Sequence, residues 1–422
     1  MSQDNPKAPS RRRFLGAAGL AGAAASLPAN AASAANAAMT ETAGATLPFY
    51  GARQSGITTA MQDHIYFAAF DLKTEQRADV VALLQRWTLA AARMMAGQPA
   101  EPGTQNEEEP PLDSGEALGL SPARLSITFG FGPDLFSLNG KDRYGLAAKR
   151  PAALVDLPRF NGDQLEESQC GGALCVQACA NDSQVAFHAV RQLARLGYGA
   201  TSLKWVQSGF STANKTKGTP RNLMGFKDGT MNPTGHEMDE VVWAGAEGPA
   251  WMQNGSYLVA RRIRIGLEHW DRMKVAFQEQ TFGRQKSSGA PLGGKHEFDP
   301  PDFNATDSDG NYIIPENAHA RLGAAALNDG AQILRRSYSY NDGANFTAER
   351  WPPWTQGIEF NSGLFFQAYQ KDPRTGFIKI FDKMSKFDAL NQFTTHTGSA
   401  IFACPPGAAA GSYIGAPLLE SA

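Results

Sequence analysis

The feature of this sequence that most restricts its fold is an order of predicted strands and helices that occurs twice. In the first half, apolar residues recur at every second position in some segments and at helical spacing in others. These segments follow one another as strand, helix, strand, strand, helix, strand. The strands are expected over 64–72, 125–131, 174–179 and 202–207, and the helices begin near Thr74 and at Asp182 or Ser183.

The second half of the chain repeats this order with different residues. Its six segments are 256–264, 267–281, 333–338, 364–369, 376–386 and 400–403. The succession is the split β-α-β arrangement of a ferredoxin-like domain, in which helices cover one face of an antiparallel sheet. We therefore predict an α+β protein with one ferredoxin-like domain over 38–215 and a second over 216–422, with a large cleft between them.

The first 37 residues have the layout of an export signal. Arginines at 11–13 precede Phe14 and Leu15, and an Ala- and Gly-rich stretch follows to Leu27. This order resembles a twin-arginine signal, whose passengers cross the membrane already folded. The uncharged run is shorter than the roughly 20 residues needed to span a bilayer, so no stable membrane span is expected. We expect a periplasmic or extracellular protein, with a flexible basic tail as the alternative and the cleavage site left open.

Composition excludes some classes of partner. The formal net charge is -2 and there is no long basic run, which argues against a nucleic-acid partner. Gln98–Ser114 is acidic and proline-containing and is predicted to be an exposed loop. The four cysteines fit no zinc site and are too few to staple a domain of this size, so we interpret them as packing residues, with a disulfide at Cys170 left open. The oligomeric state is also left open, a homo-oligomer included.

Asp228 lies in a glycine-rich stretch, residues 225–233, that reads GFKDGTMNP. Asp-Gly and Asn-Pro are strong turn formers, so the residues alone most simply indicate a turn. A second interpretation is that the glycines let the backbone approach a flat ligand closely. Asp228 would then project its carboxylate over that ligand.

Two further stretches carry a histidine and arginines. His319 is followed, sixteen residues later, by Arg335 and Arg336 at the start of a predicted strand. Arg284 lies where a predicted helix ends and a loop begins. A lone histidine is more often a packed or surface residue, and arginines in such places usually form salt bridges or meet solvent. The residues alone therefore leave these roles open.

Taken together, these stretches resemble the dye-decolorizing peroxidase family from about residue 50 to the C-terminus. The family fold is a pair of ferredoxin-like domains, in agreement with the repeated order of elements. The subgroup is similar to the exported deferrochelatase/peroxidase proteins. The matching motifs are Arg150-Pro151, LPRF at 157–160, Gly162-Asp163, CVQACAND at 175–182, the GxxDG core at 225–229 and LRR at 334–336.

The resemblance implies one haem b per chain, held in the C-terminal domain and facing the inter-domain cleft. The sequence has no Cys-x-x-Cys-His attachment motif, so the haem would be non-covalent. By the resemblance, His319 is the proximal iron ligand and Arg284 binds a haem propionate. Gly229, Thr230 and Met231 would line the distal face of the haem.

Two positions depart from the family pattern. Ala173 stands where the family often has aspartate, and Ala324–Ala326 replace a more polar loop after the proximal histidine. The second departure bears on the local haem contacts.

The same resemblance makes Asp228 the distal carboxylate and Arg335 the distal arginine. A haem iron bound by one imidazole leaves its other face open to hydrogen peroxide. A carboxylate within hydrogen-bond reach can move a proton between the two peroxide oxygens. A neighbouring guanidinium can both contact the cofactor and stabilise charge on the leaving oxygen. We therefore expect Asp228 and Arg335 to be the catalytic residues.

The predicted function is that of a haem peroxidase that reduces hydrogen peroxide and oxidises organic reductants, such as dyes and phenols, by one-electron steps. One alternative is a periplasmic deferrochelatase or haem-binding protein, for which haem itself would be the substrate. A non-haem alternative is an exported structural or sugar-binding protein.

Bulky dyes cannot reach a buried haem, so electron transfer through surface aromatic residues is a further hypothesis. Trp351, Trp354, Tyr338 and Tyr340 are the candidates. A packing role is the simpler interpretation of these side chains.

Overall fold

The structure is a computed structural model that describes residues 45–103, 106–216, 218–348 and 356–420. The predicted export signal over 1–37, together with Trp351 and Trp354, lies outside the described residues. Among the described residues, no helix has both the length and the hydropathy that a membrane span requires. The described residues all belong to one compact unit.

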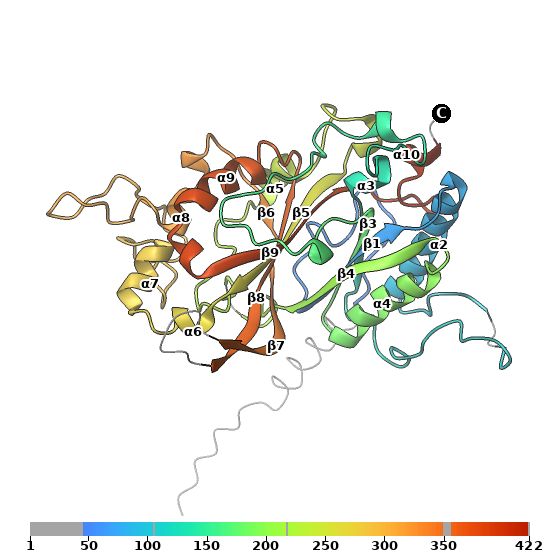
Figure 1. The fold of residues 1–422 in the computed structure, drawn as a ribbon, viewed down its shortest axis with the longest axis horizontal. Helices are drawn as coiled ribbons and strands as arrows, with labels where there is room; N and C mark the ends of the chain where they lie inside the picture. Colours follow the sequence, from blue (N-terminus) through green and yellow to red (C-terminus); the bar gives the residue numbers. More distant parts are fainter. Residues whose placement is uncertain (1–44, 104–105, 217, 349–355, 421–422) are drawn as a thin grey trace, which may run out of the picture. The chain divides into compact units, whose positions relative to one another are not determined.

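The first half contains the predicted order of four strands and two helices (Figure 1). The strands are antiparallel and lie in the order β2-β3-β1-β4. Helices α2 and α4 pack against each other, and α4 also packs against β1 and β3. The elements are β1 (His64–Leu72), α2 (Arg77–Met95), β2 (Ser126–Phe131), β3 (Leu174–Ala180), α4 (Ser183–Leu196) and β4 (Thr201–Phe210).

One predicted cap is correct and the other is wrong. The Asp182 carboxylate accepts hydrogen bonds from the backbone N–H groups of Gln184 and Val185, so it caps α4 as expected. Helix α2 instead begins after Gln76, whose side chain makes no capping hydrogen bond. The Thr74 hydroxyl accepts from the backbone N–H of Gln76 and therefore shapes the turn before the helix.

The second half repeats the arrangement, with strand order β7-β8-β5-β9. The short β6 (Leu334–Arg335) also pairs with β8. The main elements are β5 (Ser256–Ile265), β7 (Tyr338–Ala348), β8 (Gln356–Gln370), α9 (Phe377–Phe387) and β9 (Thr394–Cys404). The shorter helices of the described chain are α3 (Pro133–Phe136), α5 (Gly235–Val242), α6 (Leu267–Trp270), α7 (Val275–Phe282), α8 (His319–Leu322) and α10 (Ala416–Glu420).

Two predicted elements of this half are divided in the structure. The helix expected over 267–281 becomes α6 and α7, because Lys274 adopts an extended conformation with φ -61° and ψ 144°. The Gln278 side-chain amide donates to the Trp270 carbonyl and so holds the broken turn. The strand expected over 333–338 becomes β6 and the start of β7.

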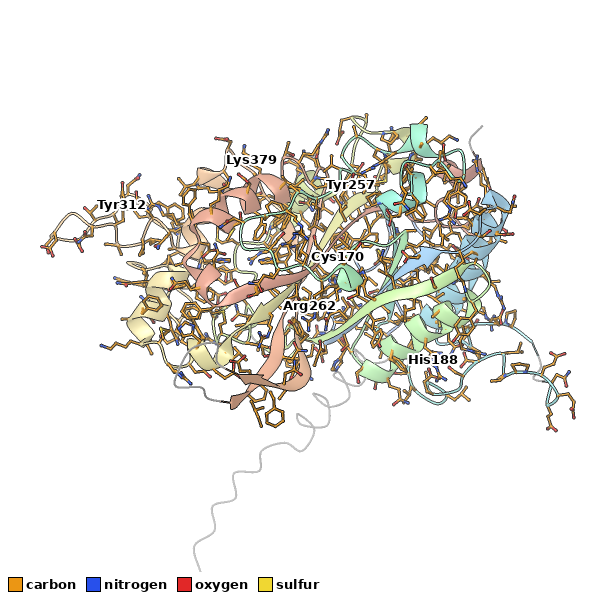
Figure 2. The ribbon with its side chains drawn as sticks, in the orientation of Figure 1. Cys170, His188, Tyr257, Arg262, Tyr312 and Lys379 are labelled. Atoms are coloured by element: carbon orange, nitrogen blue, oxygen red, sulfur yellow. The ribbon has the colours of Figure 1, made fainter. Side chains whose placement is uncertain are left out.

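The two halves share one antiparallel sheet. Strand β2 pairs with β9, and β4 pairs with β7. Since β5 also pairs with β8, the larger strands close into a ring. Arg262 of β5, labelled in Figure 2, reinforces the junction, because it donates to Gln207 of β4 at 2.8 Å and to Asp342 of β7 at 2.9 Å.

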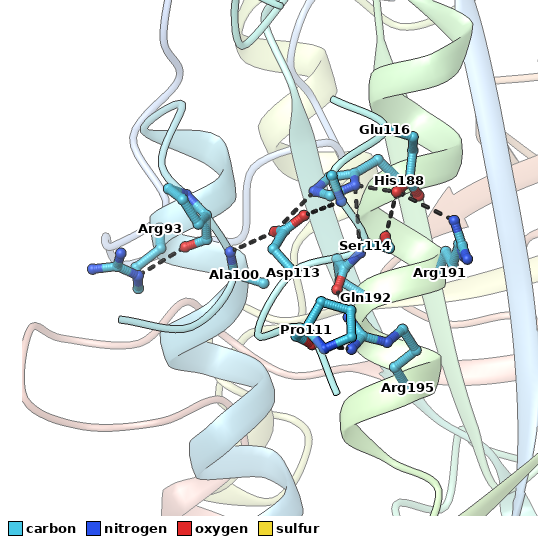
Figure 3. A network of polar contacts seen from close by, with 12 residues as sticks. Arg93, Ala100, Pro111, Asp113, Ser114, Glu116, His188, Arg191, Gln192 and Arg195 are labelled. Atoms are coloured by element: carbon cyan, nitrogen blue, oxygen red, sulfur yellow. Dashed lines mark hydrogen bonds and ion pairs between the residues drawn. The ribbon is translucent and has the colours of Figure 1, made fainter. Parts of the chain in front are cut away.

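The cysteines and the acidic loop largely follow expectation. All four cysteines are free, and Cys170 alone is not buried. The loop is exposed over 107–111, but its end is held on α4. There the carboxylates of Asp113 and Glu116 lie 3.4 and 3.3 Å from the two ring nitrogens of the buried His188 (Figure 3). This network fastens the end of the loop to α4.

Candidate active site

The candidate site is a cavity lined by residues of the second half, with about 1740 Å³ of empty space including its open mouth. Strands β5 and β8 supply one wall, because Ile263 pairs with Leu364 and directly opposite residues share a face of the sheet. Helix α9 supplies another wall through residues at helical spacing. These residues are Phe377, Ile380, Phe381 and Met384.

His319 is the first residue of α8 and lines the cavity. Its Nδ1 lies 2.6 Å from a carboxylate oxygen of Asp388, which is 7% exposed. A carboxylate can only accept, so Nδ1 carries the proton. When the ring is neutral, Nε2 therefore has a free lone pair and can bind a metal. The other oxygen of Asp388 accepts from the backbone N–H of Leu390, which holds the carboxylate in place.

Asp228 and Arg335, predicted as the catalytic pair, are in direct contact. Arg335 donates from NH1 to Oδ1 of Asp228 at 2.7 Å. The two side chains are 18% and 26% exposed, and both line the cavity that His319 also lines. The structure thus brings three residues from distant parts of the sequence to one cavity.

The stretch around Asp228 is a turn that also positions the ion pair. Gly229 has a φ of +115°, a conformation that favours glycine. The Asn232 side chain donates to the Arg335 carbonyl at 2.7 Å and accepts from the Arg335 backbone N–H at 3.1 Å. The turn is therefore fastened to β6, and the two interpretations of this stretch are compatible.

A second hollow shares part of its lining with the main cavity. It shares Asn222, Asp228, Gly229, Arg335 and Leu364 with the first cavity. Its remaining lining comes from both halves of the chain, with Met61 and Phe210 from the first. The ion pair can thus be reached from a cavity other than the one that holds His319.

Arg284 lies at the wall of the main cavity and is 8% exposed. One of its terminal nitrogens donates to the carbonyls of Gly289 and Glu297, at 2.7 and 2.9 Å. Burial lowers the pKa of this guanidinium, and the nearby charge of Arg335 adds to that effect while Glu297 opposes it. A buried cation beside the cavity favours an anionic group on a ligand.

The remaining predicted residues also lie at the cavity. Gly229, Thr230 and Met231 all line it. The Thr230 hydroxyl donates to Glu297 at 3.1 Å, and Lys227 forms an ion pair with the same carboxylate. Met231 is 61% exposed and so lies at the mouth.

Tyr338 and Tyr340 are fully buried, so the hypothesis that they are surface aromatic residues is wrong. They pack in the core between the two halves. Of the alanines that depart from the family pattern, Ala324 and Ala325 line the cavity.

Three residues of the site were not predicted from the sequence: Asn232, Asp388 and His396, the last of which also lines the cavity. Asp388 directly follows α9 and caps the next helical turn, a pattern that the sequence could have revealed. Asn232 lay within the recognised turn. Nothing in the sequence distinguished His396 from the other histidines.

Comparison with known proteins gives two family matches. Residues 54–211 match the Dyp-type peroxidase N-terminal family, and residues 219–409 match the Dyp-type peroxidase C-terminal family. The chain is 39% identical over 390 residues to a dye-decolorizing peroxidase of Thermobifida fusca, covering 87% of this chain and 84% of that protein. It is 36% identical over 434 residues to a deferrochelatase of Escherichia coli, covering 98% and 97% of the two chains.

Solved structures show the same similarity. A DyP-type peroxidase from Streptomyces coelicolor superposes with a TM-score of 0.82 at 40% identity, covering 91% of this chain and 99% of the other. Ferric DtpA from Streptomyces lividans gives a TM-score of 0.81 at 39% identity, with 91% and 99% coverage.

Proposed function

Because this chain belongs to the Dyp-type peroxidase family and is a peroxidase, we propose that it works through a non-covalent haem b held in the main cavity by His319. Hydrogen peroxide would be the oxidant and small organic molecules the reductants. The observation that carries the proposal is that one apolar cavity is lined both by His319 and by the Asp228–Arg335 pair.

The cavity residues fit a haem. The walls are apolar, as a flat macrocycle requires, and the His319–Asp388 hydrogen bond leaves Nε2 as the ligand atom. Arg284 is a buried cation with which a propionate can pair. The similar Streptomyces lividans protein was solved in its ferric form, which supports iron as the metal. When bound, the haem would supply the iron that binds peroxide and the redox chemistry.

Asp228 would move the proton during peroxide reduction. Its Oδ1 is engaged by Arg335, and no hydrogen bond to Oδ2 occurs among the described residues. We infer that Oδ2 accepts a proton from one peroxide oxygen and returns it to the other, which leaves as water. Arg335 fixes the direction of the carboxylate and places positive charge beside the oxygen that leaves. The second hollow would give peroxide a route to this pair.

The fold supports assigning the haem to one half. The orders β2-β3-β1-β4 and β7-β8-β5-β9 are the same arrangement by position, which supports two ferredoxin-like domains over 38–215 and 216–422. The cavity residues all belong to the second of these. We further propose that residues 1–37 direct export through the twin-arginine route to the periplasm or beyond.

The test is the absorbance spectrum of purified wild type and of a His319→Ala variant, each reconstituted with haem b. The wild type is expected to show a five-coordinate ferric spectrum that changes on adding peroxide, and the variant to lose it. His236→Ala is a matched control, because that side chain is 86% exposed on α5. A His319→Ala spectrum identical to that of the wild type would show that a residue other than His319 binds the iron.

A deferrochelatase is the second candidate function, favoured by the relative of that name that spans 98% of this chain. It predicts that iron-free porphyrin accumulates when the haem-loaded protein is incubated with a reductant and an iron chelator. Chelated iron and porphyrin fluorescence would both be measured. Haem that stays intact while peroxide-dependent dye oxidation proceeds would exclude the deferrochelatase function and support the peroxidase function.

A further inference from the structure

A β-bulge in β9 turns His396 toward the main cavity. Gly398 pairs with Arg262 and His396 pairs with Ile263, so Thr397 is an extra residue with no residue opposite it in the register of β5. In the absence of the bulge, the position opposite Ile263 would belong to Thr397. Because directly opposite residues share a face, His396 instead shares the cavity-lining face of Ile263.

The hydrogen bonds of Arg261 determine which nitrogen of His396 carries the proton. Arg261 donates from Nε to Nδ1 of His396 at 3.1 Å. A guanidinium cannot accept, so Nδ1 is the acceptor and the proton is on Nε2. Arg261 is itself completely buried, paired with Asp163 and bonded to the Ser399 hydroxyl at 3.0 Å. The orientation of the imidazole is therefore set by a chain of contacts that begins in the first half.

The imidazole is neutral and faces an apolar wall. Burial and then the charge of Arg261 hold the pKa of His396 well below its ordinary value. The Phe381 ring lies 4.7 Å from the imidazole, centre to centre. His396 is 9% exposed, and no described residue accepts a hydrogen bond from its Nε2. Nε2 is not among the fully buried polar atoms that lack a partner, so it is open to the cavity, where a bound molecule can accept its hydrogen bond in place of water.

We propose that His396 donates a hydrogen bond from Nε2 to a carboxylate of the molecule that occupies the cavity. This inference rests on the proposed haem site. The carboxylate has two sources, a propionate of the haem or the acid group of an organic reductant. His396 would supply a neutral donor of fixed direction, whereas Arg284, elsewhere in the lining of the same cavity, supplies a positive charge.

The experiment compares haem b with its dimethyl ester, which lacks the carboxylates. Both are loaded into the full chain, and release is followed by transfer to excess apomyoglobin. His396→Phe keeps a ring of similar size and is expected to release haem b about tenfold faster than wild type. His396→Gln retains an N–H donor and is expected to stay close to wild type. The dimethyl ester should leave at the same rate from all three proteins.

His269→Phe is the control, because His269 also packs against a phenylalanine, at 4.8 Å, but does not line the cavity. To test an organic reductant as the source of the carboxylate, KM is measured for a benzoate-type reductant and for its methyl ester. A KM that rises about tenfold in His396→Phe for the acid alone, with haem release unchanged, would assign the carboxylate to the reductant.

Three outcomes overturn the inference. Equal rates of haem b release and equal KM values in wild type and His396→Phe would show that the proposed hydrogen bond does not form. Faster release of acid and ester alike would make His396 a packing residue. A wild type that binds no haem would refute the proposed function itself, which separates the two failures.

A measurement on the wild type tests the same hydrogen bond if the variants fold poorly. Zinc protoporphyrin, which is diamagnetic, should move the ¹H–¹⁵N NMR signal of His396 Nε2 downfield. An identical signal with the zinc porphyrin diester would contradict a propionate acceptor.

Discussion

Replacing Asp228 with asparagine tests the proposed proton relay most directly. Asparagine keeps an oxygen that can accept the hydrogen bond that Arg335 now donates to Oδ1 at 2.7 Å. It cannot take up and return a proton. The geometry should therefore survive while the chemistry is lost.

The two expected effects differ in size. Loss of general acid–base catalysis lowers a rate by about 10² to 10⁴, which is about 2.7 to 5.4 kcal/mol in activation free energy. The ion pair is partly solvated, with side chains 18% and 26% exposed, so its loss should change the free energy of unfolding by less than about 1 kcal/mol. A large fall in rate without a large fall in stability is the expected signature.

The assay is stopped-flow absorbance of the haem-loaded protein mixed with peroxide, combined with urea unfolding of the same samples. Asp329→Asn is the matched control, since Asp329 pairs with Lys379 at 2.8 Å but is 89% exposed and does not line the cavity. An Asp228→Asn protein that reacts with peroxide at more than about a tenth of the wild-type rate would refute the relay.

Three further changes have defined outcomes. Asp388→Asn should weaken haem retention by about 10- to 100-fold, since it replaces the carboxylate that orients His319; equal release of haem to apomyoglobin would contradict this. Asn232→Ala removes both hydrogen bonds to the Arg335 backbone, so it should lower the free energy of unfolding in urea by about 1–3 kcal/mol and slow the reaction with peroxide. A loss of stability with an unchanged reaction rate would show that these hydrogen bonds have no role in catalysis. His396 has a depressed pKa, so below about pH 6.5 the unfolded chain binds a proton that the folded chain does not, and stability falls as pH decreases. Between pH 7.5 and 5.5 the wild type should lose up to about 1 kcal/mol more than His396→Gln, and equal losses would show that the buried ring does not resist protonation.

The sequence predicted the local elements better than their connections. Strand β1 and the cap of α4 depend on neighbouring residues; the strand was predicted correctly, and the cap was narrowed to Asp182 or Ser183, of which the structure selects Asp182. The pairing of Phe131 with Ala403 joins the two halves across most of the chain. Periodicity carries no information about such partners, so the closed ring of strands could not be predicted.

The same limit explains the errors in the second half. Strand β7 continues through Asn341, Asp342 and Gly343, which are turn-forming residues, because β8 pairs with it across an irregularity in the register. The break at Lys274 has no proline or glycine at its centre. It is held instead by the tertiary hydrogen bonds of Gln278 to Trp270 and Met273.

The choice of His319 among seven histidines illustrates how the site arises. Its own neighbours do not distinguish it, since a histidine at the start of a short helix has no special chemistry. Asp388 makes the difference, because this carboxylate places the ring proton on Nδ1 and frees Nε2 for a metal. For His396, a guanidinium on Nδ1 has the reverse effect and makes Nε2 a donor. Two imidazoles of one cavity thus acquire opposite capacities at Nε2 from the charge beside Nδ1, one as a lone-pair donor that a metal can accept and one as a hydrogen-bond donor.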